Sequence, residues 1–577
     1  KNRQASDLAK LGMMIENLLQ KPVAVNWKIK DRSFSVIEVH PVNDFLGVKK
    51  PWIPLKTGTY LKRSRLVDLF PDPVTPLFET LGIPALNQEN QKKRLISKRF
   101  FRAAFFDLEV VNGYVYQNFR DRITYQLILL NAFFSLKNST CHEKNDSIEN
   151  SRIVLSEVEK WNNTDLKSQK SVSLYESLNN QISWSAARYA DLIQNYVPSL
   201  ICCDFFAKLF FATFSCGWND QNAEFYLSFL KTGHEKVEKQ VEDITDWIQS
   251  QADPAVISNI ISSASASEID LHHLKYPAAS QDLNHRLSLL KFSFDSIPLS
   301  LDFGRSLCFD KIEYLLRQVK DRMSENKLFS ETIPEKNQMQ PKSRFHSFID
   351  LIRKKWFLKN IGWILQCHQS SETLIADLGR CNAVIQQSIQ ELGNRLKTAG
   401  GLKRFEDIAW ITARELREAV GHLDVGESVD DLSNKIQERK TVWEQNFHVI
   451  RPDVIPLDAR WKKFCMMQRG QMKEIKGTSV REGLVTAPAC VIRCYEDFLK
   501  IQTGDVIVVA MITPAWMHLI TKASAIVVDS DGMVHDRWIL ANSSKIPIIT
   551  NTKTGTRLIQ TGQIVTVNGN QGTVRLE

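Results

Sequence analysis

The segment VVDSDGMVHDRWILANSSKIPII, residues 527 to 549, contains residue types that a covalent group transfer would need. A β-branched run and a glycine-containing turn lead to His535, and a helix-like segment and a second β-branched run follow. A histidine or an aspartate can carry a transferred group, which makes His535 and its neighbour Asp536 candidate catalytic residues. The alternative is that His535 is a turn residue without a catalytic role, and that Asp536 complements a helix dipole.

The region around this segment must position these two side chains. Turns rich in Gly, Asn and Pro separate its β-branched runs, and the last run is a hairpin pattern around NGNQG. These features predict a compact α/β domain over residues 479–577, preceded by a charged linker over 458–478. The runs are GDVIVVAMI (504–512), ASAIVVDS (523–530), KIPIIT (545–550) and GQIVTVNGNQGTVRLE (562–577).

The middle of the chain, residues 45–457, is predicted to form a mainly helical domain. Its segment 372–400 has apolar residues at three- and four-residue spacing and ends at a Gly-Gly pair, a helix stop signal. The most apolar run, residues 200–218, is interrupted by Asp204 and Lys208, which a bilayer would penalise. With Pro198 as a start signal, this run predicts a buried core helix and no transmembrane segment.

The first 44 residues form a third unit with a helix pattern, DLAKLGMMIENLLQ, and two short strands, VAVNWKI and FSVIEVHPV. Such a fragment has too little core to be stable alone. The sequence also starts at Lys1 rather than Met. We therefore expect native sequence upstream of residue 1.

The composition favours a soluble, multidomain protein of the cytoplasm. The chain has 577 residues, and 43% of them are hydrophobic and 24% charged. The ten cysteines form neither a disulfide framework nor a zinc pattern, and His272-His273 has no companion ligands nearby, so no metal site is predicted. No nucleic-acid signature accompanies the net charge of +9. Basic clusters at 91–102 and 353–356 leave contact with an anionic membrane surface open.

The order of the three regions resembles phosphoenolpyruvate synthases and their relatives, including rifampin phosphotransferases. The resemblance implies that residues 1–44 end an ATP-grasp domain, that an acceptor-substrate domain follows, and that residues 479–577 form a swivelling phosphohistidine domain. In such enzymes the swivelling histidine takes phosphate at the ATP site and carries it to the acceptor. The similar segments are NWKIKDRSFSVIEVHPV, FPDPVTPLFETLG, GLKRFEDIAWITARELREA, and IKGTSVREGLVTAPACVI through TGDVIVVAMITPAWMHLI to the C-terminus.

The carrier motif departs from the family pattern, which reads approximately D-x-G-G-x-x-S/T-H-A-A-I. A gap-free alignment from Asp529 puts Asp536, not His535, at the carrier position. A one-residue slip would restore His535 but needs an insertion and a compensating deletion. Arg537 and Trp538 stand where the family has small residues, and the indole would hinder entry into a tight cleft.

The nucleotide positions that the resemblance implies are also substituted. The family strand D-I-E-W reads AVNW here, so Asn26 replaces a carboxylate that serves a hard divalent metal. The family strand L-Q-A-R-P reads IEVHP, so Glu38 and His40 replace groups near metal and phosphates. Glu38 and His40 are more often surface strand residues than parts of a nucleotide site. The family's Gly-His-Arg turn has its nearest match at Gly304-Arg305.

Two main hypotheses follow. The first is a pseudoenzyme that serves as a scaffold, regulatory or ligand-binding protein and has a protein partner. The second is a divergent ATP-dependent phosphotransferase or ligase that acts on a small-molecule acceptor through Asp536 or His535. ATP and Mg²⁺ are expected only if an intact ATP-grasp half exists upstream. A third, weaker hypothesis is a protein that binds an anionic surface through its basic clusters.

Overall fold

The computed structural model describes a large part of the chain. The described residues are 23–30, 33–41, 52–54, 59–63, 67, 69–96, 107–119, 144–213, 234–251, 277–295, 300–305, 307, 319, 348–447, 449, 451–456, 474–510, 522–530 and 546–577. Helices and sheets both contribute, so the predicted mixed α/β class is confirmed. Several predicted features lie outside these residues: the N-terminal helix pattern, His272-His273, most of the linker, and the helix-like segment that follows His535.

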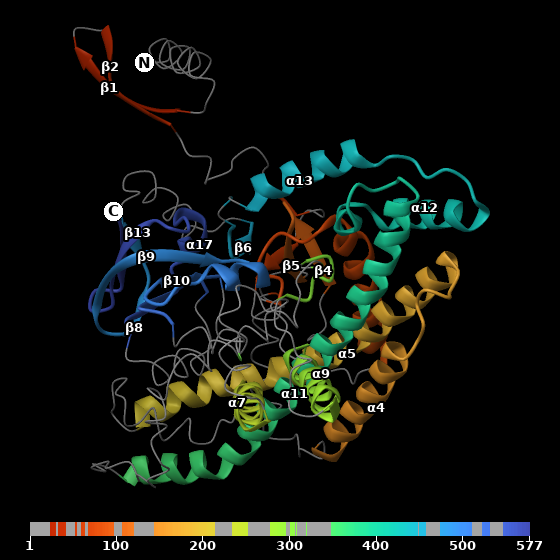
Figure 1. Ribbon diagram of the computed structural model, residues 1–577. Helices are drawn as coiled ribbons and strands as arrows, with labels where there is room; N and C mark the ends of the chain where they lie inside the picture. Colours follow the sequence, from red (N-terminus) through yellow and green to blue (C-terminus); the bar gives the residue numbers. More distant parts are fainter. Residues whose placement is uncertain are drawn as a thin grey trace.

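The two predicted N-terminal strands form an antiparallel hairpin of β1 (Val23–Lys30) and β2 (Ser33–Pro41). Val23 pairs with Pro41, and the register shifts between Asn26 and Trp27. In Figure 1 this hairpin lies apart from the other described elements.

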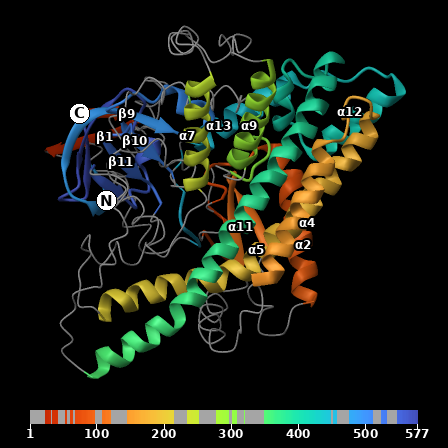
Figure 2. The ribbon, with the colours of Figure 1, turned by 60° about the horizontal axis from the view of Figure 1, so that its bottom comes forward.

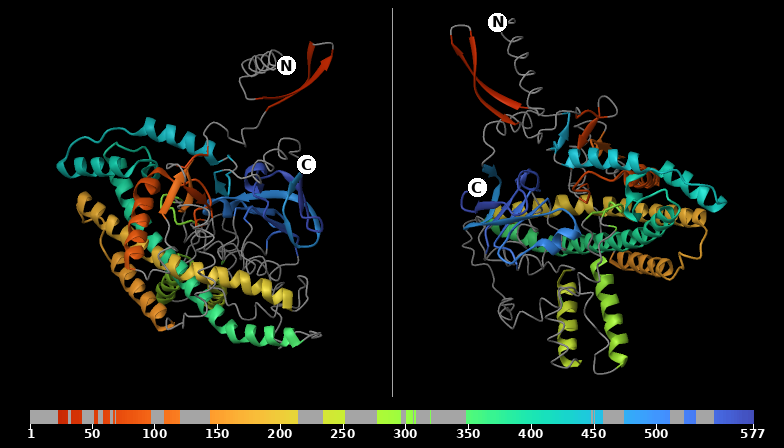
Figure 3. Two further views of the ribbon diagram at one scale, coloured as in Figure 1. Left: turned by 180° about the vertical axis from the view of Figure 1, so that it is seen from behind. Right: turned by 45° about the horizontal axis from the view of Figure 1, so that its top comes forward.

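The helical part is built around two long helices, α5 (Ser171–Thr213) and α11 (Phe348–Thr398), which pack against each other. Figure 2 shows α4 alongside them and α7 next to α9, and Figure 3 shows the long pair from behind. Buried side chains from α5 and α11 form one core with residues of the neighbouring elements. The other helices are η2 (Phe78–Gly82), α2 (Ile83–Ile96), α4 (Lys144–Asn162), α7 (His234–Gln251), α9 (Pro277–Asp295), η6 (Phe405–Trp410), α12 (Ala413–Val425) and α13 (Ser433–Phe447).

The interpretation of Pro198 as a helix start is wrong, because α5 runs through it from Ser171 to Thr213. A proline inside a helix removes one backbone hydrogen bond and costs about 3 kcal/mol. The long contact with α11 supplies tertiary packing that outweighs this local cost.

The predicted stop of α11 is confirmed by its local geometry. Gly400 has a φ of +82°, and the Gly401 N–H donates to the Leu396 carbonyl, which closes the helix end. Farther along, Thr412 caps α12 by accepting a hydrogen bond from the Glu415 N–H.

A small sheet lies at one end of the helical part in the order β4-β5-β3-β6. It brings residues near 60 beside residues near 455, because β3 and β6 pair. Its core includes Tyr114 and Tyr116, both fully buried. The strands are β3 (Tyr60–Lys62), β4 (Asp107–Val111), β5 (Tyr114–Phe119) and β6 (Val454–Ile455).

The C-terminal domain contains the strands expected from its β-branched runs. These are β10 (Val506–Val509), β11 (Ala525–Val528), β12 (Ile548–Thr550), β13 (Ile564–Asn568) and β14 (Thr573–Leu576). Three further strands precede them, β7 (Glu474–Lys476), β8 (Thr478–Arg481) and β9 (Leu484–Ile492). The sheet therefore begins inside the segment expected to be a linker. Two short helices are η7 (Tyr495–Lys500) and α17 (Gly555–Leu558).

The sheet of this domain curls back on itself. Among the described residues its order is β7-β14-β13-β9-β10-β11-β12-β8, so β7 and β8 stand at opposite ends. Gly477 alone separates these two strands in the sequence. The ends of the sheet must therefore meet at Gly477. A Cβ atom there would lie 2.5 Å from a methyl carbon of Ile549, so the crossing requires glycine.

Candidate functional site

The carboxyl ends of the parallel strands form the edge of the C-terminal domain at which a site is expected. Strand β10 pairs in parallel with β9 and β11, and β11 pairs in parallel with β12. In α/β sheets ligands bind preferentially outside the carboxyl ends of such strands. Arg493 follows β9, Asp529 follows β11, and the segment 551–557 follows β12.

Asp529 fastens the segment after β12 to the end of β11. Its buried carboxylate accepts hydrogen bonds from the Thr552 hydroxyl at 2.7 Å, from the Gly555 N–H, and from the N–H and hydroxyl of Thr556. Both carboxylate oxygens are used. The residue that begins the carrier motif thus has a structural role here, and it places the start of α17, including Arg557.

Arg557 joins the C-terminal domain to the helical part of the chain. Its side chain is buried, and its Nη2 donates to the Tyr114 hydroxyl at 2.7 Å. Its Nε donates to the Phe447 carbonyl at 3.1 Å. Burial lowers the pKa of this guanidinium, but nearby Tyr114 and Asp529 outweigh burial and raise it. Arg557 therefore stays charged in the interior.

Arg493 also contacts both the C-terminal domain and the helical part. Its Nη2 donates to the Thr556 carbonyl at 2.8 Å, and its guanidinium lies 4.7 Å from the ring centroid of Phe447. Its own carbonyl accepts a hydrogen bond from Arg305 Nη2 at 3.3 Å. Burial lowers the pKa of Arg493, and the positive charge of Arg557 acts in the same direction.

On the opposite side, Asp302 holds the turn that carries Arg305. The Asp302 carboxylate accepts from the Thr75 N–H at 2.7 Å, the Thr75 hydroxyl at 2.8 Å and the Gly304 N–H at 2.9 Å. Burial raises the pKa of Asp302, and the hydrogen bonds from Thr75 oppose this effect. These contacts unite two segments of the family resemblance, FPDPVTPLFETLG and Gly304-Arg305.

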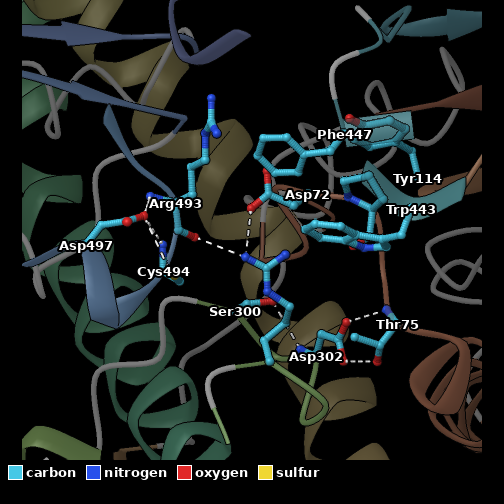
Figure 4. A network of polar contacts seen from close by, with 12 residues as sticks. Asp72, Thr75, Tyr114, Ser300, Asp302, Trp443, Phe447, Arg493, Cys494 and Asp497 are labelled. Atoms are coloured by element: carbon cyan, nitrogen blue, oxygen red, sulfur yellow. Dashed lines mark hydrogen bonds and ion pairs between the residues drawn. The ribbon is translucent and has the colours of Figure 1, made fainter. Parts of the chain in front are cut away.

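Arg305 lies between the two halves of the site. Its Nη2 is 3.6 Å from Asp72 Oδ2, and its guanidinium lies 4.9 Å from the ring centroid of Trp443. Figure 4 shows the rings of Tyr114, Trp443 and Phe447 on one side of Asp72, with Arg493 on the other. Arginines from both parts of the chain therefore meet at aromatic rings of the helical part.

The structure does not place the predicted carrier side chains. His535 and Asp536, together with Arg537 and Trp538, lie outside the described residues. The chain is described up to Ser530 and again from Ile546.

The predicted nucleotide positions lie in the N-terminal hairpin. The strand register pairs Asn26 with Glu38 and His40 with Ala24. Only the backbone is described here, so the assignment of these residues to a nucleotide site stays a prediction.

In the described part of the chain, no group of three or more His, Cys, Asp or Glu side chains could hold a metal ion. No helix there is long and apolar enough to cross a membrane.

Comparison with known proteins gives the class of the C-terminal domain. Residues 501–572 match the family described as the PEP-utilising enzyme, mobile domain. A segment of 107 residues is 33% identical to an uncharacterized phosphotransferase of Bacillus subtilis and covers 18% of this chain and 13% of that protein.

Longer segments are similar to two further kinds of protein. A probable phosphoenolpyruvate synthase of Archaeoglobus fulgidus is 26% identical over 155 residues, which cover 26% of this chain and 21% of the relative. A rifampicin phosphotransferase of Bacillus cereus is 25% identical over 199 residues, which cover 33% and 22%. The chain thus matches only a minor part of the length of each relative.

Residues 501–572 therefore carry the mobile domain of the PEP-utilising enzymes, and longer segments of the chain are similar to phosphoenolpyruvate synthase and rifampicin phosphotransferase. The resemblance predicted from the sequence is confirmed at this level.

Proposed function

We propose that this protein is a pseudoenzyme of the PEP-utilising family that acts as a ligand-binding, scaffold or regulatory protein with a protein partner. The substitutions at the carrier position, where Asp536 replaces histidine, and at Asn26 and His40 support this reading. Each removes a group that the family's phosphate chemistry uses, and the substitutions lie in two separate parts of the chain.

The observation that supports this proposal best is the set of hydrogen bonds that hold the C-terminal domain against the helical part. A carrier domain must leave one site to reach another. Here Arg557 is buried and hydrogen-bonded to Tyr114 and Phe447, and Arg305 bonds the backbone of Arg493. Hydrogen bonds of charged groups contribute roughly 1.5–3 kcal/mol each when buried. Separation of the two parts would break several of them together, which favours a docked, binding role.

Phosphoryl labelling tests the proposal directly. The full chain is incubated with Mg²⁺ and ATP labelled at both its β- and γ-phosphates, and protein-bound label is counted. We expect no stoichiometric label. The matched surface variants Asp165→Ala and His422→Ala are the controls. The pseudoenzyme proposal would be contradicted by label that these controls keep and that Asp536→Ala or His535→Ala loses.

A divergent phosphotransferase or ligase acting on a small molecule is the second candidate, and the names of the relatives favour it. In this case Asp536 or His535 carries the phosphoryl group. The two carriers differ chemically, because an acyl phosphate is hydrolysed in alkali, whereas phosphohistidine is stable in alkali and is lost in acid. Stability of the label under these two treatments therefore identifies the carrier.

The nucleotide requirement can be tested separately. ATP with Mg²⁺ raises the melting temperature of a protein that binds it in the native state. The pseudoenzyme proposal predicts no shift that requires both ATP and Mg²⁺. A saturable shift lost on substitution of Glu38 would support an active nucleotide site instead.

A further inference from the structure

Four arginines meet at the boundary between the helical part and the C-terminal domain. Shared neighbours hold this group together. Arg451 and Arg557 both lie 5.4 Å from the ring centroid of Tyr114. Phe447 contacts both Arg493 and Arg557. We call the group the interface arginines: Arg305, Arg451, Arg493 and Arg557.

Each interface arginine keeps one buried nitrogen atom without a hydrogen-bond acceptor among the described residues. The atoms are Arg305 Nη1, Arg451 Nε, Arg493 Nε and Arg557 Nη1. Buried polar atoms are nearly always hydrogen-bonded in native proteins. Four open donors on arginines that share neighbouring side chains therefore indicate a missing acceptor.

The nearby carboxylates do not supply this acceptor. Asp72 lies 3.6 Å from Arg305, at the long end of an ion pair. Asp497 accepts from Lys500 and from the N–H groups of Arg493 and Cys494. The carboxylates of Asp302 and Asp529 are occupied by amide and hydroxyl donors. None of these four carboxylates accepts a hydrogen bond from the four open nitrogen atoms.

The cluster is not sealed from solvent. The side chain of Arg305 is 17% exposed, and Arg451 and Arg493 are only partly buried. Arg305 therefore marks the side from which a small solute can approach the cluster.

We propose that the interface arginines bind a small dianion of the phosphate type between the two parts of the chain. This inference rests on the ligand-binding function proposed above and names its ligand class. The planar fork of arginine matches the oxygens of phosphate, and charge-assisted bonds of this kind are strong. Arg305 and Arg451 come from the helical side, and Arg493 and Arg557 come from the C-terminal domain. A bound dianion would therefore bridge both parts and favour the docked arrangement.

Binding of inorganic phosphate to the full chain tests the inference. Titration calorimetry and melting curves are measured with phosphate, and with acetate at equal ionic strength as the monoanionic comparison. We expect saturable binding of phosphate with a rise in melting temperature, and no such effect with acetate. Arg305→Gln and Arg493→Gln should each weaken phosphate binding roughly 10- to 100-fold, because each removes a charged donor.

Arg414→Gln is the matched control, because the side chain of Arg414 is 86% exposed on α12. It should bind phosphate like the wild type. If Arg305→Gln fails to fold, Arg451→Gln takes its place. The proposed phosphate site would be overturned if the wild type did not bind phosphate, or if the interface and control variants bound it equally.

This outcome is independent of the labelling experiment. Stoichiometric label on Asp536 would remove the pseudoenzyme reading and leave phosphate binding by the arginines intact. Loss of the arginine site would leave the pseudoenzyme reading without its ligand class.

Discussion

The guanidinium of Arg557 and the hydroxyl of Tyr114 form a buried hydrogen bond of 2.7 Å although the two residues belong to different parts of the chain. Arg557 lies in α17 of the C-terminal domain, and Tyr114 is the first residue of β5 in the small sheet. The position of the C-terminal domain is thus set by a specific donor and acceptor as well as by shape.

Removal of the Tyr114 hydroxyl should loosen this docking. Tyr114→Phe keeps the ring but leaves Arg557 with one acceptor fewer, which should cost roughly 1–3 kcal/mol. Small-angle scattering and limited proteolysis should report a more open chain and faster cleavage between the two parts. Tyr116→Phe is the control, because its hydroxyl donates to the Pro452 carbonyl within the helical part. Equal opening in both variants would contradict a specific role for Tyr114.

The turn before Arg305 should not tolerate a side chain at Gly304. A Cβ atom there would lie 2.3 Å from the Thr75 hydroxyl oxygen, which also bonds Asp302. Gly304→Ala should therefore lower the free energy of unfolding by roughly 1–3 kcal/mol in urea denaturation. Gly421→Ala offers a matched contrast, because nothing lies within 4 Å of a Cβ atom there and the residue is within α12. It should be neutral or stabilise by up to about 1 kcal/mol.

A buried carboxylate in the helical part should make stability depend on pH. Asp377, on α11, accepts from Arg380 at 2.9 Å and from the Ser151 hydroxyl at 3.1 Å. Burial raises its pKa from 3.8 to about 6, against the opposing charge of Arg380. The native state then binds more protons than the unfolded state between these values. This contribution to stability is complete below pH 3.8 and is lost as the pH rises through about 6.

Because one pKa unit corresponds to about 1.4 kcal/mol, the shift of the Asp377 pKa from 3.8 to about 6 changes the free energy of unfolding by up to about 3 kcal/mol. Urea unfolding at closely spaced pH values should show it as a fall in stability toward neutral pH. Asp377→Asn should flatten the profile in this window, and Asp165→Asn, on an exposed segment, should not. A profile unchanged by Asp377→Asn would assign the slope to other groups.

Local pattern predicted much of the fold but only one part of the site. The β-branched runs and the Gly-Gly stop of α11 are local signals, and the structure contains the corresponding elements. The path of α5 through Pro198 was missed because tertiary packing outweighs a local propensity. Gly304-Arg305 was noticed through the family resemblance. Arg493 and Arg557 were missed because only the folded sheet brings them together. For Arg493 the available signal was its place directly after the buried end of β9.

The closure of the C-terminal sheet at Gly477 also limits how other proteins can recognise this domain. Partner peptides often extend a sheet by β-augmentation, which needs a row of free backbone groups along an outer strand. Here the two terminal strands are β7 with three residues and β8 with four, and they meet at a bend. Neither is long enough to template an added strand. Over the described strands, a protein partner would therefore recognise side chains and loops of this domain rather than extend its sheet.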